Sequence, residues 1–431
     1  MGVYALLVVG ATSALTNAAS ACRSWPACNG RWFAVDSLSL AVVWGHRTAA
    51  VVTGGLVVAA AVLAWRRDTG RRVRAAVTVA LLAYPVQVGV GAFTATSGSS
   101  AAVSAMHLAL GVLIFAGLVA ALAWTLERQT GHLPSAEWEG EPKSDDDTDS
   151  APSEGPLATA YAYFRLTKPR LMWLLCLVAA AGMALAAGPT LRMDTVAFTL
   201  GGGVLAIGAS GTFNHVLERE KDKKMSRTDD RPIATDRIPK RNALAFGFAL
   251  AAASLVAFYS VNLLTAALGL TAIVFYSVVY TLVLKPNTRQ STVIGGAAGA
   301  LPALIGWAAV TGEVGVAGLA LATVIFLWTP AHFYNLALAY KDDYERGGFP
   351  LMPVVSGEAT TRKHIVYYLG ATLVSAMALA AVTPLGLLYA ATTTVFGAVF
   401  LYAAVRLHRE RDRPAAMRAF HASNAYLGCL L

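Results

Sequence analysis

Uninterrupted apolar runs of about 20 residues recur from residue 3 to the end of the chain, separated by short polar loops. A helix of that length spans the ~30 Å hydrocarbon core of a bilayer, and the runs lack the alternation typical of transmembrane β-barrel strands. Of the 431 residues, 56% are hydrophobic and only 14% are charged, which excludes a soluble, collagen-like or disulfide-scaffold protein. The sequence therefore predicts an all-α fold, a polytopic transmembrane helical protein.

The apolar runs form two groups on either side of a polar stretch. We expect spans near 3–20, 39–65, 75–96 and 103–126, then near 171–188, 194–213, 242–260, 262–284, 292–311, 314–340, 363–381 and 383–404, with a partial last span from about 418. The first and last runs look short, and we expect the first to serve as an anchor rather than as a cleaved signal peptide. These groups predict a four-helix membrane domain at 1–127 and a bundle of about nine helices at 159–431.

Charge separates the two groups and orients them. Segment 135–154 holds eight acidic residues and one lysine, so we expect residues 128–158 to be an acidic disordered linker. Every second loop is basic: those near 66–74, 165–170, 221–241, 285–289, 341–363 and 406–418. The positive-inside rule then places the linker and these loops in the cytoplasm of a multi-pass protein of the cell (plasma) membrane.

The first acidic segment, Asn214 to Pro232, follows a predicted span. Asn214, Glu218 and Asp222 are four residues apart and would share one face of a helix. Mg²⁺ prefers one or two carboxylates together with substrate phosphates, and arginines such as Arg227 and Arg231 bind phosphates with several donors. A solvated, mixed-charge loop is the alternative interpretation of this segment alone.

A second acidic segment, Trp328 to Gly357, lies four spans later on the same predicted side of the membrane. It contains Asp342 and Asp343, flanked by Tyr340 and Tyr344. Two such segments at equivalent positions are typical of an internal repeat whose halves face one site. His332, in the preceding helix, either approaches a substrate there or completes the bundle core.

These residues resemble the UbiA superfamily of intramembrane prenyltransferases, and within it the heme O synthase (protoheme IX farnesyltransferase) family. The resemblance runs from about Tyr163 to the end of the chain and rests on Leu166 to Arg170, Asn214 to Pro232, Tyr280 to Lys285, Gly295 to Pro302, Ile305 to Trp307, and His332 through Pro350 to Val354. Departures are Glu218, where the superfamily has aspartate, and Pro286, where a basic residue is expected.

The resemblance implies a UbiA-type bundle that transfers a farnesyl group from farnesyl diphosphate to heme B, with water completing heme O, for heme-copper oxidase biogenesis. It implies catalytic roles for Asn214, Glu218, Asp222, Asp342 and Asp343, with Mg²⁺ held by Glu218, Asp222 and Asp343. The substrate-binding residues that it implies are Lys168, Arg170, Arg227, Arg231, Lys285, His332, Tyr340, Lys341 and Tyr344. Besides its substrates and membrane lipids, the partners that it suggests are heme A synthase or oxidase assembly factors, and not nucleic acid.

Two alternatives stay open at this point. One is a UbiA-type prenyltransferase acting on an aromatic or lipid acceptor, although the Tyr340 to Tyr344 pattern and Pro350 to Pro353 favour the heme branch. The other is a non-catalytic heme-binding assembly protein. A transporter is disfavoured, because the helices of the second group lack charged residues at the membrane midplane.

The first group contains His46 and His107 at matching depths of two parallel spans, a pattern that suits a heme with two histidine ligands. A single hydrogen-bonded histidine in each helix is the alternative. Cys22 and Cys28 fall in a predicted outside loop, where a disulfide is favoured. This group resembles one half of heme A synthase, in the loop from Cys22 to Gly30 and in the His46-Arg47 pair. Val43 stands where that family has glutamate, so heme oxidation by this half is not implied.

Overall fold

The computed structural model describes residues 1–15, 21–28, 30–33, 35–98, 100–131 and 155–431, and these are largely helical. Eleven of the described helices are long and apolar enough to cross a membrane. The one β-feature in the described part of the chain is an isolated bridge between Cys28 and Arg31. The prediction of an all-α, polytopic membrane protein is confirmed, whereas most of the predicted linker at 128–158 lies outside the described residues.

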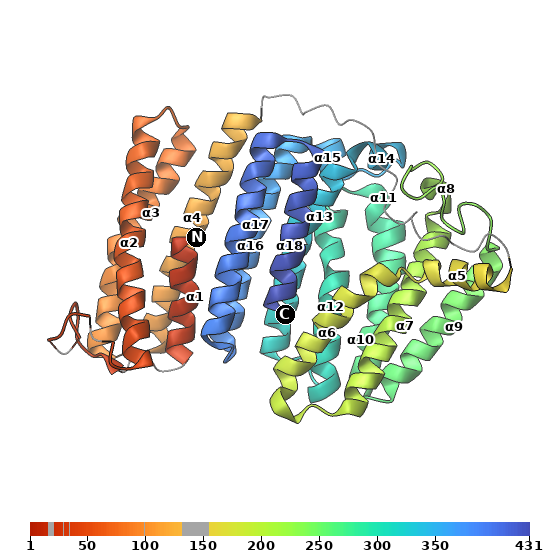
Figure 1. Ribbon diagram of the computed structural model, residues 1–431, viewed down its shortest axis with the longest axis horizontal. Helices are drawn as coiled ribbons and strands as arrows, with labels where there is room; N and C mark the ends of the chain where they lie inside the picture. The colour runs from red at the N-terminus through yellow and green to blue at the C-terminus, as the bar shows by residue number, and fades with distance from the viewer. Residues whose placement is uncertain (16–20, 29, 34, 99, 132–154) are drawn as a thin grey trace. The chain divides into compact units, whose positions relative to one another are not determined.

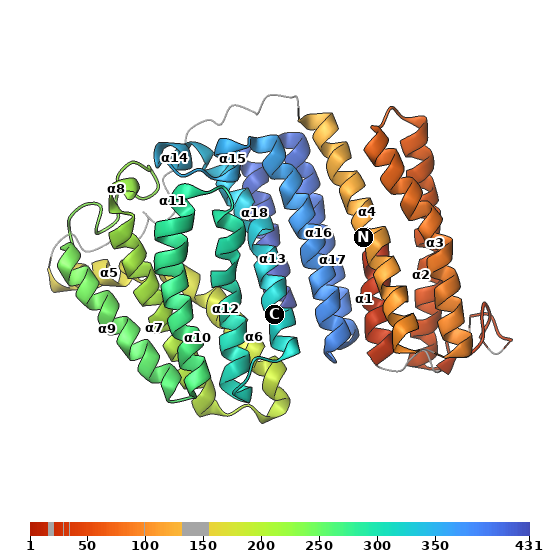
Figure 2. The same ribbon diagram turned by 180° about the vertical axis from the view of Figure 1, so that it is seen from behind.

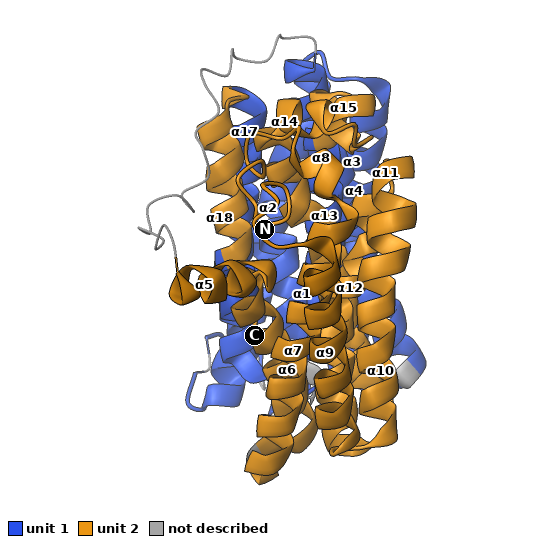
Figure 3. Cartoon of the chain, turned by 90° about the vertical axis from the view of Figure 1, so that its right-hand side faces the viewer, with its two compact units in different colours: residues 1–134, 362–409, 425–430 blue, residues 135–361, 410–424, 431 orange. Residues whose placement is uncertain are grey.

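The chain divides into two compact units, coloured in Figure 3. Unit 1 comprises residues 1–134, 362–409 and 425–430, and unit 2 comprises residues 135–361, 410–424 and 431. This division differs from the predicted domain boundaries, because most of α16 (Glu358–Val382) and α17 (Gly386–Glu410) belong with the first four helices. Helix α18 (Arg413–Leu430) contributes to both units.

Unit 1 is built on α1 (Gly2–Leu15), α2 (Leu38–Arg66), α3 (Arg71–Ser97) and α4 (Ala101–Thr130). Helix α3 packs against both α2 and α4 (Figure 1). Ala123 and Leu126 of α4 share a buried apolar cluster with Val366 of α16. Lys363 Nζ also lies 2.5 Å from Glu127 Oε1. These contacts place α16 in unit 1, although it follows the second group of spans in the sequence.

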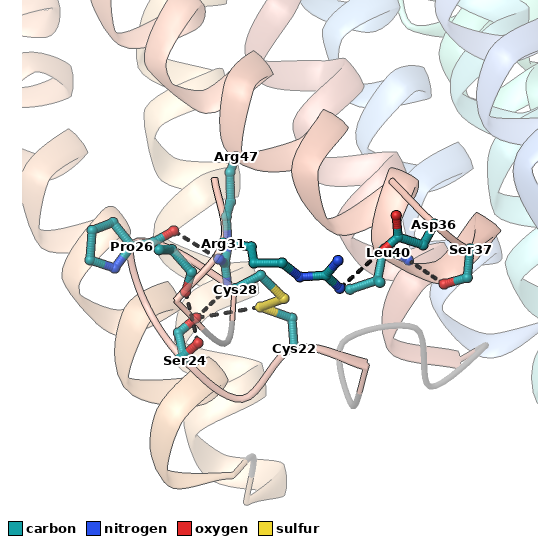
Figure 4. Close-up of a disulfide and its surroundings, with 10 residues drawn as sticks. Cys22, Ser24, Pro26, Cys28, Arg31, Asp36, Ser37, Leu40 and Arg47 are labelled. Atoms are coloured by element: carbon teal, nitrogen blue, oxygen red, sulfur yellow. Dashed lines mark hydrogen bonds and ion pairs between the residues drawn. A yellow bond between two sulfur atoms is a disulfide. The ribbon is translucent and has the colours of Figure 1, made fainter. Parts of the chain in front are cut away.

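A small disulfide loop precedes α2 (Figure 4). Cys22 and Cys28 are bonded, with Cα atoms 5.4 Å apart, and both pack against Trp44 of α2. The Arg47 guanidinium donates hydrogen bonds of 2.9 Å to the carbonyl oxygens of Ser24 and of Pro26. Arg47 therefore ties the loop to the helix that carries His46.

Unit 2 contains the long helices of the candidate site and several short ones. They are α5 (Pro156–Leu166), α6 (Pro169–Ala187), η3 (Gly188–Thr190), α7 (Met193–Leu217), α8 (Arg219–Asp222), α9 (Lys240–Tyr259), α10 (Leu263–Val274), η4 (Phe275–Leu284), α11 (Lys285–Asn287), α12 (Ser291–Thr311), α13 (Val316–Ala339), α14 (Lys341–Arg346) and α15 (Met352–Val355). Figure 2 shows α12 beside α10 and α13.

Small residues let the backbones of unit 2 approach closely, as is usual between membrane helices. A Cβ on Gly306 of α12 would lie 2.0 Å from the carbonyl oxygen of Ala179 in α6. A Cβ on Gly182 of α6 would lie 2.4 Å from the carbonyl oxygen of Ala303. This crossing fixes α6 against α12, and both helices line the cavity of unit 2.

Candidate functional site

Unit 2 contains a partly open apolar cavity of about 290 Å³ between α6, α7, α9, α10, η4, α12 and α13. Apolar side chains such as Ile207, Phe258, Ile273 and Phe333 line most of it. Its polar lining includes Lys168, Tyr276 and Tyr280. The cavity therefore suits a hydrocarbon chain with an anionic head at Lys168.

Lys168 occupies the junction between α5 and α6, directly before Pro169. Its φ of 54° is left-handed, a conformation that costs a non-glycine residue about 1–3 kcal/mol and recurs at functional sites. The ammonium group donates to Asn214 Oδ1 and, at 3.5 Å, to Tyr276 Oη. Burial, reinforced by the Arg231 charge, lowers the pKa of Lys168 to about 7. This ammonium is therefore poised to lose or gain its charge near neutral pH.

The first acidic segment places three polar side chains near this lysine. Helix α7 ends at Leu217 and α8 begins at Arg219, so a helix break separates Asn214 from Asp222. Asn214 Nδ2 donates to Thr281 Oγ1 at 3.2 Å. Glu218 and Asp222 are only 5% and 3% exposed. The break does not remove either carboxylate from the interior.

Each buried carboxylate of this segment has a cationic partner. Lys285 Nζ lies 2.6 and 2.8 Å from the two Glu218 oxygens, and Arg231 donates to Asp222 at 2.9 and 3.0 Å. Burial alone would raise the pKa of Glu218, but the Lys285 and Lys168 charges hold it below its ordinary value. Burial raises the pKa of Asp222 and the Arg231 charge only partly offsets it.

Arg227 of the first acidic segment contacts the second segment. Its guanidinium carbon is 4.7 Å from the ring centre of Tyr340 and 5.3 Å from that of Tyr344, and it donates to Tyr344 Oη at 3.0 Å. Arg413 of α18 stacks on the same Tyr340 ring at 4.6 Å. The two tyrosines of the second segment therefore orient the arginine of the first.

Asp343, expected as a metal ligand, is fully buried and surrounded by protein donors. Its carboxylate accepts from the backbone N–H of Ser226 at 2.8 Å, from that of Arg227 at 3.3 Å and from Arg346 at 2.5 Å. Asp342 is exposed on α14. The two aspartates of the second segment therefore have surroundings that differ from those of Glu218 and Asp222.

The remaining expected substrate residues have other surroundings. Arg170 is exposed at the start of α6, and Lys341 Nζ lies 3.3 Å from Glu358 Oε1. The His332 ring stacks between Trp328 and Phe420, with centroid distances of 4.2 and 4.4 Å, and its Nδ1 is 2.7 Å from Ser423 Oγ. His332 is therefore held in an aromatic stack against α18.

In unit 1, His46 of α2 and His107 of α4 both have a buried Nδ1 without a hydrogen-bond partner among the described residues. The second ring nitrogen of His107 is 3.4 Å from Gln87 Nε2. A Cβ on Gly91 would lie 3.0 Å from His107 Cε1, and one on Gly10 would lie 3.5 Å from His46 Cε1. Gly91 thus leaves room for the His107 ring, whereas a side chain at Gly10 would make only an ordinary contact with His46.

Several residues of the site were missed by the sequence argument. Tyr276 and Thr281 belong to η4, a stretch of π-helix, and Thr281 Oγ1 donates to the carbonyl oxygen of Tyr276 at 2.8 Å. Lys221 and Lys285 lie 4.2 and 4.3 Å from the ring centre of Phe349. Tyr276 stands in an apolar span, four residues before Tyr280 of the Tyr280 to Lys285 motif. This spacing was the signal in the sequence that could have identified Tyr276 as a site residue.

The carboxylates of the site suit a divalent cation only when a bound substrate supplies further oxygen ligands. Among the described residues, no group of three or more histidine, cysteine, aspartate or glutamate side chains is arranged to hold a metal. Glu218 and Asp222 are nevertheless two buried carboxylates whose charges interact, and Mg²⁺ commonly takes one or two carboxylates plus phosphate oxygens. Asp343, the third expected ligand, differs from this pair because both of its oxygens accept hydrogen bonds from protein donors.

Comparison with known proteins matches the part of the chain that contains most of the candidate site. The family model described as the UbiA prenyltransferase family matches residues 174–427. The chain is 73% identical over 436 residues to a protoheme IX farnesyltransferase of Halobacterium salinarum, covering 100% of this chain and 98% of that protein. A protein of the same name from Mycolicibacterium paratuberculosis is 43% identical over 284 residues, covering 64% of this chain and 92% of that protein.

A solved structure, reported under the name digeranylgeranylglyceryl phosphate synthase, shares the fold, with a TM-score of 0.53 at 14% identity. The match covers 63% of this chain and 97% of that one. The family model and the full-length relatives show that the chain belongs to the UbiA prenyltransferase family, among the protoheme IX farnesyltransferases.

Proposed function

We propose that this membrane prenyltransferase joins the farnesyl group of farnesyl diphosphate to a vinyl group of heme B, and that water completes heme O. The observation that carries the proposal is the apolar cavity with Lys168 in its wall, where the lysine donates to Asn214 and its charge interacts with those of the two ion pairs. The full-length relatives of the same family, at 73% and 62% identity, support heme as the acceptor. An aromatic or lipid acceptor remains the alternative within the family.

The cations of the site would bind the diphosphate. Lys168, Lys285 and Arg231 already interact with Asn214, Glu218 and Asp222, and the stacked guanidinium of Arg227 adds a planar donor. Glu218 and Asp222 would hold Mg²⁺, which when bound neutralises part of the diphosphate charge. Preorganised cations stabilise the charge that develops on a departing diphosphate. Asn214 would orient Lys168 for this task.

The hydrocarbon chain would occupy the cavity. Breaking the carbon–oxygen bond releases diphosphate and leaves an allylic cation, which the apolar walls shield from water. The faces of Tyr276, Tyr280 and Phe333 line the cavity and can stabilise positive charge. The vinyl carbon of heme B would then attack the cation, and water would add to the resulting porphyrin-stabilised cation with loss of a proton.

The direct test uses purified protein in detergent with heme B, farnesyl diphosphate and Mg²⁺, followed by extraction and mass analysis of the hemes. We expect a farnesylated hydroxyethyl heme that disappears in Glu218→Gln and persists in Glu220→Gln, whose carboxylate is exposed. If heme B is recovered unchanged and an aromatic compound is prenylated instead, the acceptor is that aromatic compound and not heme. No product with any acceptor would favour a non-catalytic heme-binding assembly protein.

The two free cysteines offer a test of the cavity itself. Cys176 lines the cavity, whereas Cys429 is exposed near the end of α18. We expect farnesyl diphosphate to slow the reaction of Cys176 with a small permeant thiol reagent at least severalfold and to leave Cys429 unaffected. Equal protection of both cysteines, or of neither, would place the hydrocarbon chain elsewhere.

A second role for the N-terminal helices rests on a separate observation. The unpartnered Nδ1 atoms of His46 and His107, with Gly10 and Gly91 beside the rings, support heme binding by this heme A synthase-like half. We expect a six-coordinate low-spin absorption spectrum that is lost in His46→Ala and in His107→Ala but kept in His421→Ala. An unchanged spectrum in both variants would leave this half without a heme role.

The product would serve heme-copper oxidase biogenesis, with heme A synthase or oxidase assembly factors as partners. The location proposed for the chain is the plasma membrane, with the basic loops and both acidic segments on the cytoplasmic side.

A further inference from the structure

The buried Asp343 carboxylate on α14 accepts hydrogen bonds from four donor groups. Both carboxylate oxygens are used: Oδ1 accepts from the Ser226 N–H at 2.8 Å, the Ser226 hydroxyl at 3.0 Å and Arg346 at 2.5 Å, and Oδ2 accepts from the Arg227 N–H at 3.3 Å. The side chain has no exposed surface. Such a carboxylate fixes the backbone that donates to it.

The backbone that Asp343 fixes carries Arg227, although 117 and 116 residues separate Asp343 from Ser226 and Arg227. The Arg227 guanidinium then lies against Tyr340 and Tyr344, which flank Asp343 in sequence. Backbone and side chain of Arg227 are therefore both held by the second acidic segment.

An independent contact locks the same two segments. Met225 is buried with Tyr344 and Phe349 in one apolar cluster. A Cβ on Gly347 would lie 2.9 Å from Met225 Sδ, so the glycine lets the two segments pack closely without moving the Met225 side chain. The residues on both sides of Arg227 and Asp343 thus pack as one body.

We infer that Asp343 is a positioning residue that holds Arg227 toward the diphosphate, and that it is not a metal ligand. This inference rests on the proposed function, in which Arg227 binds the diphosphate. Oδ1 of Asp343 already accepts three hydrogen bonds and Oδ2 accepts one, so Mg²⁺ would have to compete with the donors that hold this backbone in place. Among the described residues, the Glu218 and Asp222 carboxylates instead pair with the side chains of Lys285 and Arg231, and side chains can turn away from an arriving cation.

The test is a double-mutant cycle between Asp343→Asn and Arg227→Gln, with farnesyl diphosphate and Mg²⁺ varied separately. We expect Asp343→Asn to raise the KM for farnesyl diphosphate about tenfold while leaving the Mg²⁺ concentration for half-maximal activity within about twofold. In the Arg227→Gln background, the same change should raise KM by less than about twofold. Glu345→Gln, an exposed acid of the same short helix, is the matched control.

Two results would overturn the inference. One is an Mg²⁺ concentration for half-maximal activity that rises about tenfold or more in Asp343→Asn, and the other is a KM effect of Asp343→Asn that keeps its full size in the Arg227→Gln background. If Asp343→Asn does not fold, Ser226→Ala keeps the carboxylate and removes one donor, and the same cycle with Arg227→Gln decides. If the wild-type protein makes no farnesylated heme, the proposed function fails. In that case the same mutant cycle is measured as the affinity for farnesyl diphosphate by calorimetry. A failure of the proposed function is then distinguishable from a failure of the positioning role of Asp343.

Discussion

At the residue scale, the candidate site consists of buried charges that neutralise one another until a substrate arrives. Lys285 pairs with Glu218, and Arg231 pairs with Asp222. Removing one member of a buried pair leaves an uncompensated charge, whereas replacing both by neutral groups is often tolerated. Stability and catalysis should therefore respond differently to the same substitutions.

We predict that Lys285→Met destabilises the protein by about 3–5 kcal/mol, because the Glu218 carboxylate stays buried without its partner. Adding Glu218→Gln should recover most of that loss without restoring transfer. Unfolding in detergent monitored by circular dichroism measures both variants, together with the heme product. A double variant as unstable as the single one would show that the ion pair is not the source of the loss.

A pH dependence follows from Lys168, whose pKa burial lowers to about 7. The ammonium is charged below this pH and neutral above it, so affinity for the anionic diphosphate should fall as pH rises through about 7. We expect KM for farnesyl diphosphate to rise by up to about tenfold per pH unit above that point. In Lys168→Arg, which keeps its charge, the rise should vanish apart from the titration of the substrate itself. Parallel profiles in both proteins would exclude Lys168 as the titrating group.

At the element scale, two features shape the cavity: the π-helix η4 and the close crossing of α6 and α12. A π-helix widens the turn, and such stretches are frequent at functional sites. Here η4 carries Tyr276 and Tyr280 into the cavity wall and Thr281 to Asn214. The crossing at Gly182 and Gly306 holds the opposite wall.

We predict that Gly306→Ala is destabilising by about 1–3 kcal/mol or more, because its Cβ would lie 2.0 Å from the Ala179 carbonyl oxygen and α6 must move. Gly201→Ala in α7 is the matched control, since no atom lies within 4 Å of its added Cβ. The control should be neutral or slightly stabilising. Thermal unfolding in detergent compares them, and equal midpoints would mean that the crossing is looser than described.

At the scale of the whole molecule, basic loops alternate with nearly uncharged ones between the eleven long apolar helices of the described residues. The positive-inside rule orients the chain from this asymmetry. The proposed arrangement puts both acidic segments, and hence the diphosphate, on the cytoplasmic side. It also puts the disulfide-bonded loop, with Cys22 and Cys28, on the oxidising side.

This orientation predicts a labelling pattern in intact cells. In a background of Cys176→Ala and Cys429→Ser, a cysteine replacing Glu313, between α12 and α13, should react with an impermeant thiol reagent. A cysteine replacing Asp236, between α8 and α9, should react only after the cells are opened. The reverse pattern would invert the orientation and place the diphosphate site outside.

Much of the site could be predicted along the chain, because its motifs are local. Hydropathy located every long helix, and spacing brought Asn214, Glu218 and Asp222 together as candidates. The roles assigned to individual residues were less accessible. Asp343 stands in an acidic motif, but its partners lie 116 and 117 residues away, and no local pattern reveals that its oxygens are already used.

The sequence by itself determined that this chain is a polytopic helical membrane protein with the UbiA motifs, because apolar length and motif order need no tertiary information. Only the tertiary structure decided which unit α16 and α17 join, where the π-helix η4 forms in the cavity wall, and which donors surround Asp343. The physical reason is that these depend on contacts between residues far apart in the chain, whose geometry is set when helices pack.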